Sequence, residues 1–561
     1  MIQDLLQRWH GQPRCVILDS DFGDGARFLS ALQAWQDHPR RPVILHYLAM
    51  SPQPVAIAAL PQELRAQWPP FVPGFHRMAL RQGRVILDLL IGDAEASLVQ
   101  IDASLDAAWL PAPLRSSTVL ARLMSPGASL HAAQLDDAQR LALIKAGFVF
   151  GADGLSAVFH SRRPPAVRPA LERRAIERRA IVIGAGLSGA AACERLCARG
   201  WDVTLIERHG QPAQEASGNL AGIFMPVLSK DDNPATRLSR AAYLFALRHW
   251  RNLGNGFEGQ QCGVLQLARD ARHAEVQRQI AASGAYPRDF ARWLDAAEAG
   301  ALLGAPAPHG GWLFGQGGWA YPASVCRMML DACGPRLTRI FASGVAALEY
   351  GAGEWRALDA DGRLIAQAPS VILANGNGAV RIQQAGSLPL SAVRGQVTHL
   401  AEGSLPAPPL VVCREAYLTP AAHGVVCAGA TYDLDHERAL RTSSQQENLH
   451  KIAAILDIAA PDAPLAGRVG FRCVATDRLP LAGALPNPAI AGRCERLRDV
   501  PRWPGLFGLL GYASRGLIWA PLAAELLAAQ LEGEPLPLES SLAAALDPGR
   551  FLLKERRRHG P

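Results

Sequence analysis

The sequence predicts an α/β protein with two successive Rossmann-like domains, the second of which carries an inserted antiparallel sheet. In the first half, apolar stretches such as CVILDSDFG and PVILHYLAM alternate with helical stretches such as ARFLSALQAW. The pattern restarts at Ala180 with AIVIGAGLSGAAACERLCARGWDVTLIER. Strands that alternate with helices form mostly parallel sheets, so each half predicts one. Within the second half, AAHGVVCAGATYD and its neighbours predict the antiparallel sheet.

The domain boundaries follow from this pattern. A chain of 561 residues allows two to four domains with ample core. Residues 161–179 are rich in Pro and Arg and lack apolar periodicity, which is typical of a linker. We therefore expect a first domain over residues 1–160 and a second over residues 180–555, in which the nucleotide-binding and antiparallel subdomains interleave.

Composition and charge narrow the class of protein. The net charge of +7 suits a polyanionic partner, although an Arg-rich proteome explains it equally well. The linker and the basic tail FLLKERRRHGP are either spacers or phosphate contacts. The 10 cysteines form no CxxC pair, so we expect no metal site, and reduced thiols in the cytoplasm. Neither a signal peptide nor a membrane-spanning helix is expected, and the sequence carries no signal for an oligomeric state.

A glycine pattern predicts a dinucleotide site in the second domain. Gly184-x-Gly186-x-x-Gly189 follows the apolar strand AIVI and opens an Ala-rich helix. The three glycines permit a tight turn, close approach of a pyrophosphate and close helix–strand packing, and the helix N-terminus favours the phosphate charge. Glu207 ends the next strand, where an acid can bind a ribose diol and disfavours NADP. The alternative is a glycine-rich turn without a ligand.

Features further along the chain favour FAD over NAD. They are the small-residue loop around Ser217, the strand VILANG at residues 371–376, and the turn in LLGYASRGLIWAPLAAELLAAQL, which opens a long apolar helix. Each could be ordinary turn chemistry, and their order along the chain carries the inference. The residues expected to bind the cofactor are Gly184, Ala185, Gly186, Ser188, Gly189, Glu207, Arg208, Ser217, Gly218, Asn219, Gly511, Ser514, Arg515, Gly516 and Leu517.

From about residue 178 to 555 the chain resembles the FAD-dependent D-amino-acid oxidase and glycine oxidase superfamily. The stretches that carry the likeness are EASGNLAGIFMPVLSKDDNP, GWLFGQGGWAYPASVC, VRGQVTHL, GRVGFRCVATDRLPLAGALP and GYASRGLIWAPLAAELLAAQ. Within that superfamily they are similar to the bifunctional tRNA 5-methylaminomethyl-2-thiouridine biosynthesis proteins. The resemblance implies a tRNA substrate with 5-carboxymethylaminomethyl-uridine at the wobble position. A hydride equivalent leaves the glycine-like arm for the flavin, the imine hydrolyses to glyoxylate and 5-aminomethyl-uridine, and oxygen reoxidises the flavin.

Such a reaction needs a cation for the carboxylate of the arm, and Arg forms a planar two-point clamp. By the resemblance, Arg472 in VGFRC matches the substrate-binding Arg of glycine oxidase-like enzymes, and a structural ion pair is its alternative role. Arg394 and Arg515 are further candidates. Tyr417 and Tyr432 either line the pocket or pack in the core. No general base is expected, because a neutral amine beside the flavin is sufficient.

Residues 1–160 resemble the methyltransferase domain of the same family, which uses S-adenosylmethionine to methylate the aminomethyl group. The family loop reads like ETGFGTGLNFL, whereas this chain has DSDFGDGARFL, which places Asp21 and Asp24 where the backbone approaches the cofactor. Ser51 stands where an acid holds the ribose, and a family loop is missing near Trp109. Each change removes a contact, so we expect a folded domain with weak or lost methyl transfer.

Two other functions remain open from the sequence. One is an oxidase of free small amines such as glycine, and the other is a non-catalytic tRNA-binding protein with a structural flavin. The Arg-rich linker, the basic tail and the attached first domain favour the tRNA-modifying oxidoreductase over the first alternative.

Overall fold

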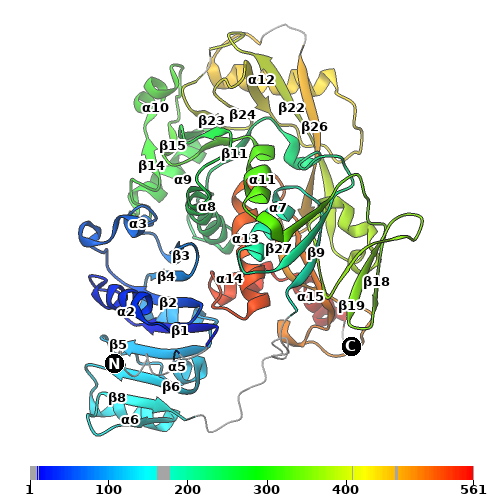
Figure 1. Cartoon of the computed structure of the whole chain (residues 1–561). Coiled ribbons are helices and arrows are strands. Elements are labelled where there is room, and N and C mark those ends of the chain that lie inside the picture. Colours follow the sequence, from blue (N-terminus) through cyan, green and yellow to red (C-terminus); the bar gives the residue numbers. More distant parts are fainter. Residues whose placement is uncertain (1–8, 10–11, 161–176, 407, 461–464, 560–561) are drawn as a thin grey trace. The chain divides into compact units, whose positions relative to one another are not determined.

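The computed structural model describes residues 9, 12–160, 177–406, 408–460 and 465–559. The chain forms two compact units (Figure 1). Unit 1 comprises Met1–Ile176 with Ala528–Ala543, and unit 2 comprises Glu177–Leu527 with Ala544–Pro561. The expected linker lies outside the described residues except for its last three positions.

Unit 1 is built on one eight-stranded sheet with the order β3-β4-β2-β1-β5-β6-β8-β7. Neighbours from β4 to β6 pair in parallel, and β3, β8 and β7 pair antiparallel. The strands are β1 (Arg14–Asp19), β2 (Ile44–Ser51), β3 (Gly74–Leu80), β4 (Val85–Ile91), β5 (Leu105–Leu110), β6 (Met124–Ala132), β7 (Phe148–Phe150) and β8 (Ser156–Phe159). The helices are α2 (Ala26–Asp37), α3 (Gln62–Arg65), α4 (Ala94–Gln100), α5 (Ser117–Leu123) and α6 (Asp137–Ala146). The strand order reverses between β1 and β5, which confirms the Rossmann-like expectation.

Both faces of this sheet are buried. Val16 and Leu18 of β1 pack into one hydrophobic cluster, whereas Cys15 and Ile17 pack into another. Side chains alternate between the faces of a strand, so a strand buried on both sides is a nearly continuous apolar run. This is why the stretch CVILD of β1 carries no polar residue before Asp19.

The segment Ala528–Ala543 groups with unit 1, although its sequence continues the oxidoreductase. Arg77 of β3 explains part of this, because its guanidinium binds the Asp88 carboxylate at 2.8 Å and the Pro535 carbonyl at 2.7 Å. The Leu536 N–H also donates to the Asp102 carbonyl at 3.1 Å. The Arg77 and Asp88 side chains are each 2% exposed, so the pair is shielded from water.

Unit 2 contains a six-stranded sheet with the order β17-β10-β9-β21-β28-β27, parallel except for β27. Its strands are β9 (Arg179–Ile183), β10 (Asp202–Ile206), β17 (Leu337–Ile340), β21 (Ser370–Leu373), β27 (Leu481–Pro486) and β28 (Arg502–Leu510). The order reverses between β9 and β21. This is a second Rossmann-like sheet, as expected, and its switch point is where such sheets bind nucleotides.

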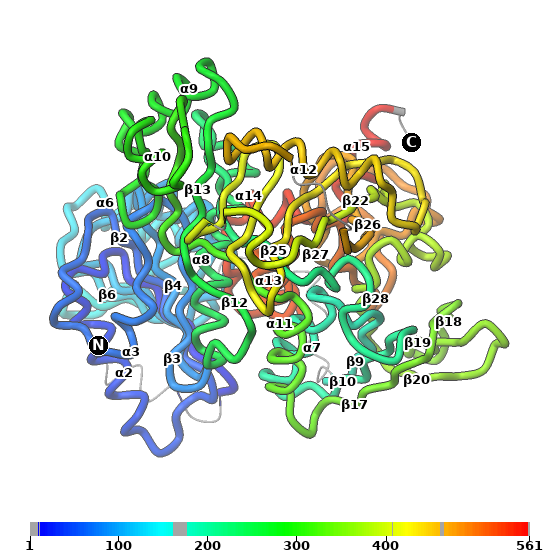
Figure 2. Tube along the Cα trace, turned by 90° about the horizontal axis from the view of Figure 1, so that it is seen from above, coloured from blue at the N-terminus to red at the C-terminus, as the bar shows by residue number. Residues whose placement is uncertain are grey.

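The antiparallel insertion is an eight-stranded sheet, β14-β15-β13-β23-β24-β25-β22-β26, in which one pair, β13 and β23, is parallel. Its strands are β13 (Val264–Leu267), β14 (Arg292–Leu294), β15 (Gly311–Phe314), β22 (Leu390–Ala401), β23 (Val411–Cys413), β24 (Tyr417–Leu418), β25 (Val425–Gly429) and β26 (Ala466–Ala475). Two three-stranded sheets complete unit 2. The first consists of β11 (Gly222–Phe224), β16 (Gly318–Ala320) and β12 (Gly259–Gln260). The second consists of β18 (Ala347–Gly351), β19 (Glu354–Leu358) and β20 (Leu364–Ala368), and it projects at one edge in Figure 2.

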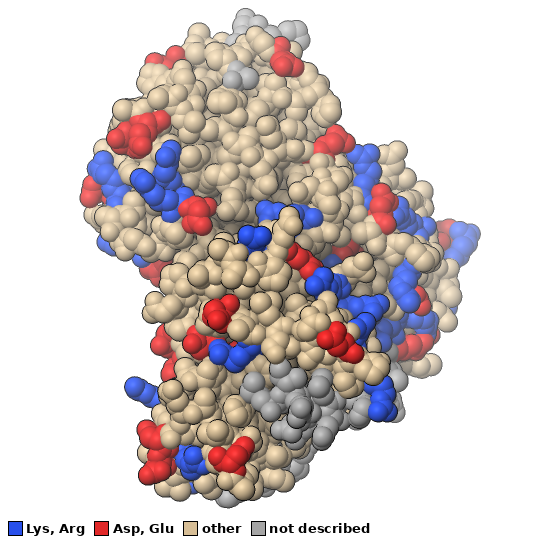
Figure 3. Space-filling model, turned by 60° about the vertical axis from the view of Figure 1, so that its left-hand side comes forward, with Lys and Arg blue, Asp and Glu red and all other residues tan. Residues whose placement is uncertain are grey.

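The remaining α-helices are α7 (Leu187–Cys197), α8 (Pro234–Asn252), α9 (Ala271–Ala282), α10 (Ala296–Leu303), α11 (Pro322–Asp331), α12 (Thr442–Leu456), α13 (Gly516–Glu532), α14 (Ser540–Leu546) and α15 (Arg550–His559). None of the described helices is both long and apolar enough to cross a membrane. On the face drawn in Figure 3, acidic and basic side chains are interspersed, so the net charge does not form a single positive field there.

The buried Arg77–Asp88 pair gives a stability prediction. Asp88→Ala removes a carboxylate that binds the buried Arg77 guanidinium, so we expect unit 1 to lose about 3–5 kcal/mol of stability. Hydrogen exchange of the β3 and β4 amides in the full chain measures this loss. Asp37→Ala is the matched control, because Asp37 is exposed and accepts hydrogen bonds from Gln33 one helical turn away. Equal protection in the two variants would contradict the prediction.

Candidate active site

A cavity of about 1390 Å³ lies in unit 2 at the carboxyl ends of the parallel strands. Its wall includes Gly184 after β9, Glu207 after β10, Ser343 after β17 and Ala374 after β21, and it continues onto the antiparallel sheet at Arg472 of β26. Twelve of the fifteen cofactor residues expected from the sequence line it: Gly184, Gly186, Ser188, Glu207, Arg208, Ser217, Asn219, Gly511, Ser514, Arg515, Gly516 and Leu517.

The glycine turn has the geometry that a pyrophosphate requires. Gly184 has φ +103°, and a Cβ there would lie 2.8 Å from the Ala374 carbonyl oxygen. Gly186 is the N-cap residue of α7 and provides no side-chain cap, so the helix start faces the cavity with a bare backbone. Ser217 Oγ accepts the Leu187 N–H at 3.2 Å and fixes the facing loop. These features fit a dinucleotide phosphate at the start of α7.

Glu207 is positioned for a ribose. Its carboxylate is largely buried and accepts the Ala185 N–H at 2.8 Å and the His209 N–H at 3.0 Å. A carboxylate has about four acceptor positions, so two remain for the hydroxyl groups of a diol. The two backbone donors also hold the carboxylate at the cavity wall, so the residues present fit FAD at this end.

Three expected residues lie behind the wall instead of on it. The Ala185 N–H supports Glu207. A Cβ on Gly189 would overlap the Gly184 carbonyl, so this glycine allows α7 to pack on the turn. A Cβ on Gly218 would overlap the guanidinium of Arg468, which donates to the Glu215 carbonyl at 2.9 Å. Their contribution is to the shape of the site.

Arg472 lies at the antiparallel end of the cavity, as the sequence led us to expect. Its Nη1 donates to the Thr431 carbonyl at 3.0 Å and to the Arg394 carbonyl at 3.3 Å. Its guanidinium lies over the Tyr432 ring, 4.0 Å from the centroid. These contacts orient the fork and leave Nη2 and Nε without a hydrogen bond to any residue that the structure describes.

Arg515 lines the same cavity directly before α13. Burial lowers the pKa of its guanidinium. Electrostatic interactions with Tyr432 and Cys413 raise this pKa, but by less than burial lowers it. Within the described residues, its guanidinium has no hydrogen-bond or ion-pair partner. A cation removed from water without a counter-ion is costly, so this position favours an anionic ligand.

Arg394 is the candidate that the structure does not bring to the cavity. Its side chain is completely buried, outside the lining, and all five of its N–H donors point to protein acceptors. No donor is left for a substrate carboxylate. The two tyrosines do line the cavity: burial raises the pKa of Tyr417, and the Tyr432 hydroxyl lies 3.4 Å from Ser514 Oγ.

In the glycine-rich loop of unit 1, side chains of the loop itself accept hydrogen bonds from the loop amides. Asp21 accepts the Gly23 N–H at 3.1 Å, and Asp24 accepts the Ala26 N–H at the start of α2 at 2.9 Å. Arg27 donates to Asp19 at 2.9 Å and also to the Asp21 carbonyl. Two amides of this loop are therefore already hydrogen-bonded to the protein's own carboxylates.

The two other altered positions of unit 1 are also placed. Ser51 ends β2 and is buried, and its hydroxyl donates to the Gln53 carbonyl at 3.0 Å. Trp109 is buried in β5 with its ring edge-on to Tyr47, at 5.8 Å between centroids. Among the described residues, no group of three or more His, Cys, Asp or Glu side chains is arranged to hold a metal ion.

Several lining residues were not predicted from the sequence. They are Ser343, Arg381, Arg414, Leu434, His436, Arg438 and Phe471. The alternation in TYDLDHERALR, residues 431–441, could have indicated Leu434, His436 and Arg438. In an extended segment, these even positions lie on one face and the polar odd positions on the other. The others reach the cavity through strand order, which no local pattern shows.

Comparison with known proteins agrees with this geometry. Residues 179–530 match the family model described as FAD dependent oxidoreductase. The chain is 42% identical over 608 residues to the "tRNA 5-methylaminomethyl-2-thiouridine biosynthesis bifunctional protein MnmC" of Burkholderia thailandensis, covering 99% of this chain and 92% of the relative. It is 42% identical over 612 residues to the protein of the same name from Burkholderia pseudomallei, with the same coverage of 99% and 92%.

Solved structures show the same fold. The glycine oxidase of Geobacillus kaustophilus aligns with a TM-score of 0.55 and 20% identity, covering 66% of this chain and 99% of its own. The iminodiacetate oxidase of Chelativorans sp. BNC1 aligns with a TM-score of 0.52 and 26% identity, covering 64% and 96%. Since the relatives match along nearly the whole chain and the FAD dependent oxidoreductase model matches most of it, this chain belongs to the MnmC family of bifunctional tRNA 5-methylaminomethyl-2-thiouridine biosynthesis proteins.

Proposed function

We propose that this chain oxidises the carboxymethylaminomethyl arm of wobble uridine, or its 2-thio form, in tRNA. The products are 5-aminomethyl-uridine and glyoxylate. The observation that carries the proposal is the half-buried Arg515, which has no partner among the described residues and lies in the same cavity as Arg472 and the dinucleotide turn. The name of the relatives supports tRNA as the substrate. We place the reaction in the cytoplasm, where tRNA is available.

The arginines are proposed to bind and orient the arm. Arg515 and the free edge of Arg472 hold the carboxylate, which presents the adjacent CH₂–NH bond to the cofactor end of the cavity. The carbon between nitrogen and carboxylate loses a hydride, and the nitrogen lone pair forms the imine. Water then adds to that carbon, and the C–N bond breaks to give glyoxylate and a primary amine. Bound FAD supplies the electron acceptor, and dioxygen, reduced to hydrogen peroxide, is the terminal oxidant.

Glu207 provides a test of the cofactor site. Glu207→Ala removes the proposed acceptor for the ribose and the partner of two buried N–H groups, so we expect the Kd for FAD to rise about tenfold or more. Titration of the apoprotein with FAD, followed by flavin fluorescence, measures it. Glu349→Ala is the matched control, because this exposed carboxylate pairs with Arg356 outside the cavity lining. An unchanged Kd for Glu207→Ala would remove this residue from the site.

Arg515 and Arg472 provide a test of the substrate site. Loss of a charge-assisted contact in each of the variants Arg515→Ala and Arg472→Ala should lower kcat/KM on the order of 100-fold. Anaerobic bleaching of the flavin by tRNA that carries the carboxymethylaminomethyl arm reports this, and Arg278→Ala, an exposed ion-paired arginine on α9, is the control. Bleaching of the unaltered protein also excludes a purely structural flavin, whereas glycine as an equally efficient reductant would favour a small-amine oxidase.

We also propose that unit 1 transfers methyl groups weakly or not at all. The protein's own carboxylates and Arg27 engage the loop that should receive S-adenosylmethionine, and a serine replaces the ribose acid. The alignment with the Burkholderia thailandensis relative runs over 608 residues, more than the 561 of this chain, so the relative carries stretches that this chain lacks. This supports the missing loop near Trp109.

Isothermal titration of the full chain with S-adenosylmethionine tests this second proposal. We expect no binding at micromolar concentrations. The double variant Asp21→Gly/Arg27→Ala removes the loop charge and the covering guanidinium, and should therefore bind more tightly than the unaltered chain. Arg41→Ala, an exposed arginine of unit 1 that stacks on Trp35, is the control. Micromolar affinity of the unaltered chain is the outcome that would sink the proposal.

A further inference from the structure

The segment that joins β25 to α12, residues 430–441, alternates between two environments. Groups at the odd positions from 431 to 441 make the hydrogen bonds that fix the segment. The side chains at the even positions 432, 434, 436 and 438 line the cavity. The sequence TYDLDHERALR therefore has one face that is held by hydrogen bonds and another face that lines the cavity.

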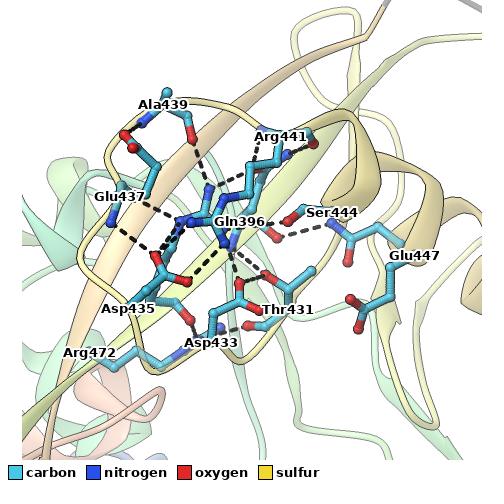
Figure 4. A network of polar contacts seen from close by, with 12 residues as sticks. Gln396, Thr431, Asp433, Asp435, Glu437, Ala439, Arg441, Ser444, Glu447 and Arg472 are labelled. Atoms are coloured by element: carbon cyan, nitrogen blue, oxygen red, sulfur yellow. Dashed lines mark hydrogen bonds and ion pairs between the residues drawn. The ribbon is translucent and has the colours of Figure 1, made fainter.

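Arg394 anchors the odd face. Its Nε donates to the Glu437 carbonyl at 2.8 Å, one Nη to the Asp433 carboxylate at 3.0 Å, and the other to the Ala439 carbonyl at 2.8 Å. The Arg394 and Asp433 main chains also exchange hydrogen bonds at 2.8 and 3.0 Å. In Figure 4 the contacts of Asp433, Glu437 and Ala439 converge on one point. A single buried guanidinium thus holds three of the odd positions, 433, 437 and 439.

A second set of contacts closes the end of the segment. Gln396 accepts the Arg441 N–H at 2.9 Å and donates to the Arg441 carbonyl at 2.8 Å. The Arg441 guanidinium binds Asp435 through two contacts of 2.8 Å, and this hydrogen bonding holds the pKa of Asp435 at about 2. The segment therefore has a defined conformation before any substrate arrives, which lowers the entropy cost of binding.

The even face presents side chains that the reaction on a free amino acid does not need. Tyr432 is 65% exposed and Leu434 is 83% exposed, and the Arg438 side chain is 71% exposed. Next to them is the ring of Phe471 on β26. Its centroid lies 6.3 Å from the centroid of the His436 ring and 5.4 Å from the Arg438 guanidinium carbon. We call Tyr432, Leu434, His436, Arg438 and Phe471 the rim.

Among the charged groups around the rim, the Arg438 cation remains available to bind a ligand. Arg438 meets Glu215 at 3.9 Å, but this carboxylate also pairs with Arg208 and with His209. The acids of the segment itself, Asp433 and Asp435, are engaged on the odd face by Arg394 and Arg441. Arg438 is thus a solvent-exposed cation that lies over the Phe471 ring and lines the cavity.

We propose that the rim binds the base and the adjacent phosphate of an unstacked pyrimidine nucleotide in an RNA loop. The proposal rests on the function proposed above and assigns the part of the site that reads the nucleotide rather than its arm. Leu434 and the rings supply a face for the base, and Arg438 contacts the phosphate, which is how proteins bind splayed-out bases in single-stranded RNA. The carboxylate of the arm reaches Arg472, which already lies over Tyr432.

The test compares two substrates on the FAD-loaded full chain. One is tRNA that carries the carboxymethylaminomethyl arm, and the other is N-ethylglycine, which has the arm without base or phosphate. For Leu434→Ala/Arg438→Ala, we expect the ratio of kcat/KM for tRNA to that for N-ethylglycine to fall about 10- to 100-fold, through KM for tRNA. Arg438→Ala alone should also reduce the slope of log KM for tRNA against log salt concentration by about one.

Matched controls come from the same surface chemistry. Leu440 is an exposed leucine of the same segment outside the cavity lining, and Arg278 is an exposed ion-paired arginine on α9. Leu440→Ala and Arg278→Ala should leave both substrates and the salt slope unchanged. The visible spectrum of bound flavin verifies that each variant is folded.

The outcomes separate the two proposals. An unchanged KM for tRNA in the rim variants, or a parallel fall in kcat for both substrates, overturns the rim as a nucleotide site. If the unaltered protein is not reduced by modified tRNA at all, the proposed function fails instead. Should N-ethylglycine prove unreactive, the division of the tRNA effect between KM and kcat, together with the salt slope, still decides.

Discussion

The substrate end of the site depends on the hydrogen bonds of one buried guanidinium, that of Arg394. It holds the odd positions of segment 430–441, and its own carbonyl accepts a hydrogen bond from Arg472. The same segment supplies Thr431, the other acceptor for Arg472. The position of the proposed substrate ligand is therefore set by a residue that touches no substrate. Removing one partner from such a buried network leaves the others unsatisfied, so its members are energetically coupled.

Local sequence patterns predicted residues that lie together at one end of the cavity. The three glycines and Glu207 occupy successive strand ends of one βαβ unit, so the requirements for turn, helix start and acid all fall within a short stretch of chain. Ala185, Gly189 and Gly218 show the limit of that reasoning. The sequence placed them among the residues expected to bind the cofactor, but whether a residue lines the cavity or supports its neighbour depends on packing across the turn.

Contacts between residues far apart in the chain determine the structural features that local sequence patterns did not predict. Ala528–Ala543 reads as part of the oxidoreductase, yet Arg77 and Asp102 of unit 1 bind its carbonyl and amide groups. Both contacts join residues more than 400 positions apart, beyond any periodicity or spacing argument. In unit 1 the residue types indicate the local hydrogen bonding: added acids in a glycine loop need donors, and the amides of Gly23 and Ala26 in that loop are the donors that the fold provides.

The three candidate arginines illustrate why residue type alone does not assign a role. An arginine has five N–H donors, and its function follows from how many of them the protein satisfies. Arg394 has all five satisfied and is structural; Arg472 has one nitrogen satisfied by two carbonyls, which orients it without using it up. Arg515 has none satisfied by the described residues while burial lowers its pKa, so binding an anion relieves an existing cost. Of the three, Arg472 and Arg515 line the cavity, whereas Arg394 lies outside its lining.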